Sequence, residues 1–431
     1  MGLRDILLFA LVFGGIPFIL RDPRIGLLYW VWLGLMNPQS MTHGPSNGFP
    51  FALVVAIATA VGILLARPKL RLDARPEVLT LLAFVAWFTA TTPLALEPDH
   101  AWSAWQRAFK VQVFTFVAIA ILSTKQDLQR FVWVMALSLG LLGAKGGLYT
   151  IATGGAGRVW GPGGFLEDNN QFALALAMTV PLLYYLAGQV RGWLKLPLAA
   201  IAILTGFAIL GSHSRGAFLA IAAMLLFLWL KSRQKLLLAP VLIVLVPTMI
   251  VFMPESWVDR MKTIGEYQAD GSAMGRITAW KLAARVAAER FPGGGGFEFQ
   301  SQFLYERYLN SDRLLSMHSI WFQALGDQGY VGLALFIATF LFSWRSAAWV
   351  IKKTRGRRDL AWAGGLAAMI QVSYVGYFVG GSFVNLAYWD MPYYLLACVV
   401  LVRRIVAQEL RTVRSEVGIP NGGVTARVPG S

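Results

Sequence analysis

The sequence predicts an all-α polytopic membrane protein with about twelve transmembrane helices and one large outer loop. Of its 431 residues, 57% are hydrophobic and only 14% are charged, whereas soluble domains carry about 25% charged residues. Apolar runs of about 16 to 25 residues recur along the whole chain, and each is long enough to cross about 30 Å of hydrocarbon as a helix. Composition and run length together exclude a series of soluble domains.

Eleven of these runs are clear predicted spans. They cover residues 49–66, 78–95, 109–124, 130–152, 170–187, 196–212, 216–230, 236–253, 318–343, 360–381 and 387–402. The stretch from Leu3 to Pro38 holds two further apolar pieces, which Arg21-Asp-Pro-Arg24 separates. One crossing plus an interfacial or re-entrant piece there gives about twelve spans in all, and two crossings give about thirteen.

The positive charge of the chain lies in connectors between these spans. The net charge of +16 suits either nucleic acid or a membrane. Basic residues cluster at 67–75, 191–195, 231–235, 352–358 and 403–404. This is the positive-inside pattern, so these connectors and the C-terminal tail are predicted to face the cytoplasm. Nucleic acid is not expected as a partner, because binding it needs the charge on one continuous face.

Residues 254–317 form a connector of a different kind, on the outer side by parity. They hold eight basic and eight acidic residues, so their formal charges cancel. Residues 275–290 predict an amphipathic helix within this loop. Its apolar face would hold Ile277, Trp280, Ala284 and Ala287, and its charged face Lys281, Arg285 and Glu289. The run Phe291-Pro-Gly-Gly-Gly-Gly296 is predicted to end this helix in a flexible break.

The predicted domains follow from this loop. Residues 1–253 form the N-terminal transmembrane helices and 254–317 the outer loop. Residues 318–405 form the C-terminal transmembrane helices, and 406–431 form a cytoplasmic tail.

Arg215 is the first candidate functional residue. It lies in ILGSHSRGAFLA, at the outer junction of two predicted spans, where the positive-inside pattern does not expect an arginine. One explanation is a snorkelling or helix-capping arginine. The other is an anion contact, because the guanidinium fork matches phosphate and the following helix start adds backbone N–H donors.

Two further candidates belong to the outer loop and its end. Arg276 begins the amphipathic helix, where a cation opposes the helix dipole and a bound anion would favour it; the alternative is a solvated loop arginine. His318 lies where the chain re-enters the membrane, in SMHSIWFQALGDQGYVGLALF. A neutral imidazole there could accept a hydroxyl proton near pH 7, or could simply anchor the helix.

A fourth group precedes the predicted span at 170–187. Arg158, Asp168 and Asn169 belong to GRVWGPGGFLEDNNQFAL. The carboxylate and amides either orient sugar hydroxyls or cap a helix that starts near Gln171, with Asn169 and Asn170 as the capping residues.

Two lysines and the single cysteine complete the candidates. Lys110 begins a span at its outer end, where a cation could meet a lipid phosphate, and Lys145 lies inside an apolar run. No metal site is expected, because Cys398 is the only cysteine, no HExxH occurs and no two histidines show ligand spacing.

These residues stand in motifs that resemble the O-antigen ligase and polymerase superfamily. The motifs are SRGAFLA, then GR…AW in the outer loop, then MHSIWFQALGDQGYVGLALF, within about residues 209–343. GRVWGPGGFLEDNNQFAL is more similar to the ligase-like members, including O-glycosylation ligases found beside exosortase systems. Many relatives have Asn after the motif histidine, where this chain has Ser319.

The resemblance implies a GT-C-like fold and a glycosyltransferase activity. It implies a bacterial inner-membrane protein that transfers a glycan from undecaprenyl diphosphate to lipid A–core on the periplasmic side, in lipopolysaccharide biosynthesis, without metal, ATP or another cofactor. On these grounds we expect inversion at the anomeric centre. The expected roles are a catalytic base for His318, diphosphate binding for Arg215 and Arg276, and support from Lys110, Arg158, Asp168 and Asn169.

Other functions remain open at this point. A polymerase of the same superfamily would join repeat units on the lipid carrier, and a protein O-glycosylation ligase would use another acceptor. A lipid-linked glycan transporter is the alternative of another class, although transporters commonly show repeated halves and no such repeat is visible here. A structural scaffold would tolerate loss of Arg215, Arg276 and His318 together.

Overall fold

The computed structural model describes residues 2–231, 271–309 and 314–416. Within these ranges the chain is helical and forms no strand; the one β-bridge joins Gly163 and Leu166. The predicted span at 236–253 and the first part of the predicted outer loop lie outside the described residues.

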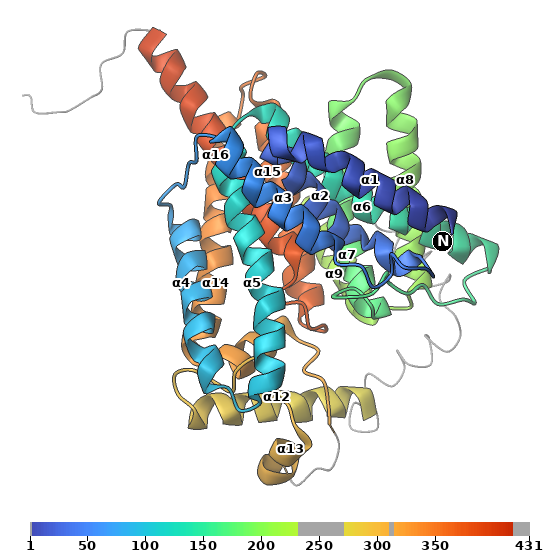
Figure 1. The fold of residues 1–431 in the computed structure, drawn as a ribbon, viewed down its shortest axis with the longest axis vertical. Coiled ribbons are helices and arrows are strands. Elements are labelled where there is room, and N and C mark those ends of the chain that lie inside the picture. Colours follow the sequence, from blue (N-terminus) through green and yellow to red (C-terminus); the bar gives the residue numbers. More distant parts are fainter. Residues whose placement is uncertain (1, 232–270, 310–313, 417–431) are drawn as a thin grey trace, which may run out of the picture.

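The first half of the chain forms six long helices joined by short connectors (Figure 1). They are α1 (Leu3–Arg21), α2 (Pro23–Met36), α3 (Phe51–Ala66), α4 (Pro76–Thr91), α5 (Pro98–Ile121) and α6 (Lys125–Ala152). Short 3-10 turns, η1 (Pro38–Met41) and η2 (Thr92–Leu94), extend two of the connectors.

The second half continues the bundle and adds helices at one of its ends. It comprises α7 (Asn169–Gln189), η3 (Gly192–Leu194), α8 (Lys195–Gly211), α9 (Arg215–Lys231), α12 (Gly271–Glu289), α13 (Gln302–Leu309), α14 (Ile320–Thr354), α15 (Ala361–Gly381) and α16 (Asp390–Glu416). Helices α4, α5, α14 and α15 stand roughly parallel, whereas α12 lies across one end of them with α13 beyond it (Figure 1). We call this end the α12 side.

Within the described residues, seven helical segments are long and apolar enough to cross a membrane. They are Leu3–Arg21, Pro76–Leu94, Lys125–Ala152, Asn169–Gln189, Gly192–Gly211, Ile320–Thr354 and Ala361–Gly381, and Phe51–Ala66 is a shorter apolar helix. The described part of the chain thus has the helical and strongly apolar character that the sequence predicts. The count of about twelve crossings stays a prediction.

The break predicted at 21–24 is present and has a local cause. Pro23 lacks the N–H that would continue α1 and instead occupies the first position of α2. Asp22 caps α2 by accepting a hydrogen bond from the Arg24 backbone N–H at 3.1 Å. The two apolar pieces between Leu3 and Pro38 are therefore two separate helices.

Helix α12 confirms the predicted amphipathic helix but turns a different face to the protein. Its buried residues are Ala279, Leu282, Ala283, Val286 and Ala287. Of the predicted apolar face only Ala287 is fully buried, while the predicted charged residues are exposed. The buried face packs on Phe299, Leu304, Tyr305 and Met317. Tertiary contacts therefore decide which face of α12 is buried, and it is not the face that carries the largest apolar side chains.

The glycine run after α12 is anchored, which corrects the predicted flexible break. The N–H groups of Gly295 and Gly296 donate to the carbonyls of Gly326 and Asp327 in α14, each at 2.8 Å. Gly329 is kinked there, with φ 67 and ψ −168, a conformation that glycine tolerates. A Cβ on Gly329 would collide with the Pro292 carbonyl. The run therefore fastens the end of α12 to a kink in α14.

Candidate functional site

His318 lies on the α12 side, two residues before α14 begins. It has a left-handed backbone, with φ 42, which is uncommon for a residue with a side chain. Its neighbours Met317 and Ser319 are buried, whereas His318 itself is half-buried. In this turn the His318 side chain thus stays partly accessible, while the residues before and after it are packed in the protein.

Helix α12 holds this turn through Trp280. The Trp280 Nε1–H donates to the Met317 carbonyl at 2.8 Å, and the Trp280 ring stacks on Phe322 with 4.9 Å between centroids. Arg276 precedes Trp280 by one helical turn, so the two side chains share a face of α12. Arg276 thus lies on the same face of α12 as the residue that holds the His318 turn.

Burial and a nearby cation favour the neutral form of the His318 imidazole. Burial lowers the pKa of His318, and the nearby Arg276 cation lowers it further, while the Asp168 carboxylate opposes the shift. Since the ordinary value is about 6.5, a lowered pKa leaves the ring unprotonated and able to accept a proton. Arg276, Asp168 and His318 are therefore close enough to influence one another.

Asp168 and Asn169 begin α7, which corrects the expected helix start near Gln171. Asp168 is the capping residue, since its Oδ1 accepts from the Asn170 backbone N–H at 2.8 Å. The buried Asn169 instead donates from Nδ2 to the Ser212 carbonyl at 2.7 Å. Asn169 therefore ties the start of α7 to the turn that precedes Arg215.

Arg215 is the first residue of α9. Its neighbour Gly216 packs against Phe383, because a Cβ on Gly216 would lie 3.1 Å from the Phe383 Cβ. The Arg276 guanidinium lies 5.9 Å from the centroid of the same Phe383 ring. Phe383 thus lies between α9 and α12, and both predicted diphosphate-binding arginines belong to segments that contact it.

The α15–α16 connector, which holds Phe383, closes the site and was not identified from the sequence. Ser382 accepts from the Trp321 Nε1–H at 2.9 Å, and Asn385 donates to the Ser316 hydroxyl. The Ala387 N–H donates to Gln323 at 3.1 Å. The sequence does hold one signal for this connector. Ser382 and Asn385 are polar residues in GGSFVN, which lies between two apolar runs on the side that parity assigns as outer.

Lys110 and Arg158 are exposed and lie apart from these contacts. Among the contacts described for residues 2–231, 271–309 and 314–416, none joins either side chain to His318 or Arg276. Arg158 lies over the Trp160 ring, 5.9 Å from its centroid, and lines a groove with Lys145. Arg107, one turn before Lys110, forms an ion pair with Glu298.

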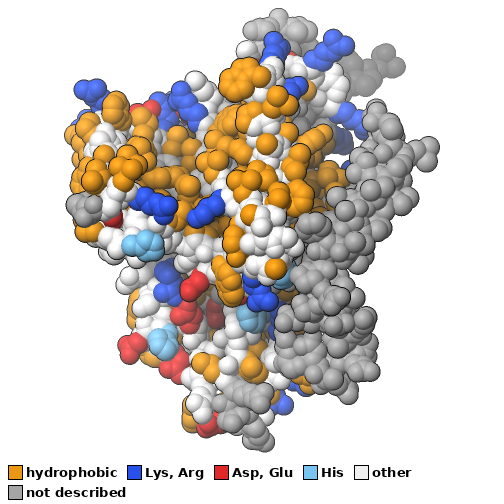
Figure 2. All heavy atoms as spheres, turned by 90° about the vertical axis from the view of Figure 1, so that its right-hand side faces the viewer, with side chains coloured by type: hydrophobic (Ala, Val, Ile, Leu, Met, Phe, Trp, Pro, Cys, Tyr) orange, Lys and Arg blue, Asp and Glu red, His pale blue; other side chains and the backbone are white. Residues whose placement is uncertain are grey.

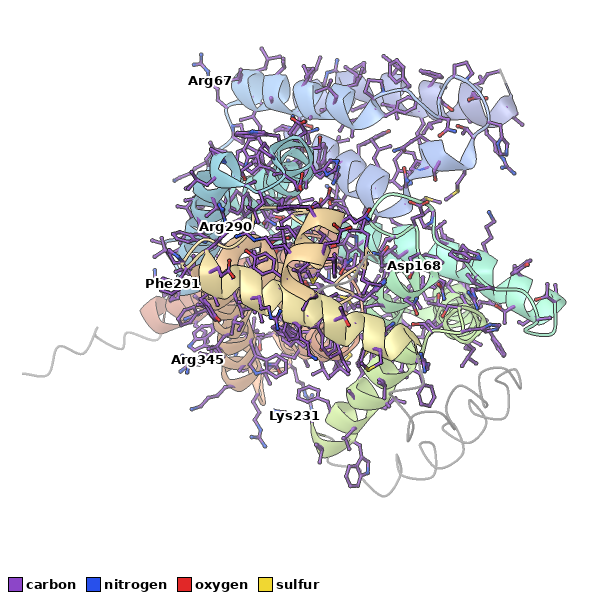
Figure 3. The ribbon with its side chains drawn as sticks, turned by 90° about the horizontal axis from the view of Figure 1, so that it is seen from below. Arg67, Asp168, Lys231, Arg290, Phe291 and Arg345 are labelled. Atoms are coloured by element: carbon purple, nitrogen blue, oxygen red, sulfur yellow. The ribbon has the colours of Figure 1, made fainter. Side chains whose placement is uncertain are left out.

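The site gathers on one half of α12. Seen from below, Asp168 lies beside the half of α12 that begins the helix, whereas Arg290 and Phe291 lie at the other end (Figure 3). No group of three or more His, Cys, Asp or Glu side chains in the described residues is arranged to hold a metal ion. The chemistry available here is a neutral imidazole with neighbouring guanidinium groups and a carboxylate.

Two family models match the chain. The model of O-antigen ligase matches residues 200–337, which include Arg215, Arg276 and His318. A family of unknown function (DUF5935) matches residues 3–188. Among curated proteins, none matches the chain. The match at 200–337 covers the segments that carry the two arginines and the histidine, and it supports membership of the chain in the O-antigen ligase superfamily.

Proposed function

We propose that the protein is an O-antigen ligase, an inverting, metal-independent glycosyltransferase. It would transfer a glycan from undecaprenyl diphosphate to lipid A–core at the periplasmic face of the bacterial inner membrane. One observation carries the proposal most: Arg276 and Asp168 both act on the half-buried His318, and Arg276 and His318 fall within the O-antigen ligase match. The superfamily as a whole implies a membrane-embedded, lipid-linked glycan as substrate.

In the proposed reaction His318 acts on the acceptor. Its neutral imidazole takes the proton of the acceptor hydroxyl as the oxygen attacks the anomeric carbon. The bond from that carbon to the diphosphate oxygen breaks on the opposite face, and the electron pair leaves with the diphosphate. A single displacement of this kind inverts the anomeric centre.

The arginines act on the leaving group. Negative charge on the diphosphate grows as the glycosidic bond breaks, and Arg215 and Arg276 offset that charge with fixed donor forks. Phe383, which contacts both segments, would keep them at the spacing that a diphosphate needs. Asp168, Asn169 and Arg158 are proposed to support the geometry, and Lys110 stays a proposed cation near a lipid phosphate.

The test is a reconstituted transfer assay with purified protein, a lipid-diphosphate glycan donor and lipid A–core. We expect Arg215→Ala to abolish transfer, whereas Arg191→Ala, in the α7–α8 connector, keeps wild-type turnover. Transfer by Arg215→Ala at the wild-type rate would contradict the role given to Arg215. Extension of the donor glycan without transfer to lipid A–core would identify a polymerase instead.

The proposed topology places α12 and residues 254–317 in the periplasm. Cys398 is buried and is the single cysteine, so a Cys398→Ser background allows single cysteines to be labelled from either side. We expect a cysteine at exposed Lys281 to react with an impermeant reagent in intact spheroplasts and one at exposed Lys353 to react only after lysis. The reverse pattern would overturn the assignment of sides.

A further inference from the structure

A second basic feature lies on the face formed by α1, α6 and the α6–α7 connector. A groove of about 450 Å³ opens there. It is lined by two arginines, a lysine and a histidine, namely Arg4, Lys145, Arg158 and His43. Of the described residues that line the groove, none is acidic. Figure 2 faces this side and shows basic and histidine side chains lying across a surface whose upper part is largely hydrophobic.

Backbone packing brings together the two segments that carry Lys145 and Arg158. A Cβ on Gly146 would lie 2.9 Å from a Val159 methyl group, so the connector lies directly on α6. Lys145 and Arg158 are the chain neighbours of these two contacting residues, and both side chains are exposed. The Val159 N–H donates to the Gly211 carbonyl at 2.9 Å, which holds the connector in this place. A groove lined by cations with no acidic residue in its described lining favours an anion as its ligand.

The surroundings of these cations favour a ligand that carries acyl chains. Trp160 is 58% exposed and Tyr149 is 49% exposed, and both line the groove. Exposed Trp and Tyr beside apolar helices are typical of the membrane–water boundary. Lys145 lies seven residues before the end of α6 at Ala152, about 10 Å along the axis, so its aliphatic stem runs beside hydrocarbon toward the headgroups.

We propose that this groove binds the phosphate group of an anionic membrane lipid, with Lys145 and Arg158 as the phosphate contacts and Trp160 against the acyl chains. The inference goes beyond glycan transfer and does not rest on it. The same cations could also recognise a soluble phosphate, so the experiment separates the two sources.

Lipid binding is measured by native mass spectrometry on the full chain in detergent, titrated with phosphatidylglycerol, phosphatidic acid or phosphatidylcholine. The groove variant is Lys145→Gln with Arg158→Gln. The matched control is Lys353→Gln with Arg345→Gln, because Lys353 is an exposed helix lysine and Arg345 lies 6.0 Å from the Phe342 ring. Thermal unfolding checks that both variants fold.

We expect the groove variant to bind the two anionic lipids about 30-fold more weakly, since a cation near an anionic headgroup contributes about fivefold. The control should bind as the wild type does, and phosphatidylcholine binding should not change. Equal loss in the control, or none in the groove variant, would overturn the proposal. Displacement of phosphatidylglycerol by an equal concentration of inorganic pyrophosphate would overturn the lipid assignment.

Discussion

Arginines at the two ends of the bundle have different neighbours. Arg404, at the end away from α12, is 4% exposed. It donates to Asp73 at 2.9 Å and to the carbonyls of Leu122, Arg71 and Ile119. Arg276, on the α12 side, lies near the Phe383 ring and a half-buried histidine. One guanidinium joins three segments of backbone, while the other faces a group that can take part in chemistry.

The difference shows that charge position alone does not assign an arginine's role. Both residues are cations that the sequence places outside the apolar runs. Their neighbours distinguish them. Carbonyls and a carboxylate accept hydrogen bonds from Arg404, whereas Arg276 lies near an aromatic ring and a histidine, as the proposed diphosphate-binding role requires. Four variants test this comparison.

Arg276→Ala should have the largest effect. We expect a loss of about 10² to 10³ in the transfer rate, as for removal of one donor that stabilises developing charge. Its melting temperature should stay close to the wild-type value. Lys281→Ala, an exposed neighbour on the same helix, is the control and should transfer normally. A fully active Arg276→Ala protein would remove the contrast with Arg404.

Arg404→Ala should act on stability instead. Three buried carbonyls would lose their donor and Asp73 would keep only Arg75, which we expect to lower the free energy of unfolding by about 3 kcal/mol. Thermal unfolding in detergent measures the change, with exposed Arg411→Ala as the control. Protein that remains folded at low temperature should keep its transfer rate. A variant as stable as the wild type would show that Arg404 is not a clamp.

His318→Ala should lower the transfer rate by about 10²-fold through loss of the general base. The wild-type pKa is lowered, so the base is already neutral at pH 7 and the rate should fall only as the pH drops through that lowered pKa. The alanine variant should lose this acid limb. A pH–rate profile measures both effects, and an unchanged acid limb would assign the titration to another group.

Asp168→Asn should have the smallest effect. Burial and Arg276 lower the pKa of His318, whereas the Asp168 carboxylate raises it. Loss of that carboxylate should therefore lower the pKa further and move the acid limb to lower pH. The cap of α7 should survive, since Asn is also a good capping residue. Glu167→Gln, the exposed neighbour, should leave the profile where it is. Movement of the limb to higher pH would contradict the proposed electrostatics.

Much of the fold was predictable because the signals are local. Run length predicted the apolar helices, Pro23 explains the break after α1, and periodicity predicted α12. The face that α12 buries was not predictable in this way, because it is determined by packing against Phe299 and Tyr305, which lie outside the helix.

The candidate site was predictable only in part for the same reason. Arg215, Arg276 and His318 stand in recognisable motifs, but Phe383 enters the site through packing between α9 and α12. Nothing local distinguishes it from other aromatic residues near helix ends. Arg158, which was expected among the supporting residues, lines a groove with Lys145 that the sequence did not predict, because the connector folds back onto α6 at Gly146.

The attachment of the glycine run to the kink at Gly329 has a mechanical consequence. A helix that is held at one end moves most at the other. Hydrogen bonds from the glycine run hold α12 just beyond its last residue, Glu289. Any tilt about that pivot carries Arg276 through a wider arc than Arg290. Trp280 holds α12 a second time, one turn after Arg276, so Arg276 belongs to the short first part of the helix that extends beyond both attachments.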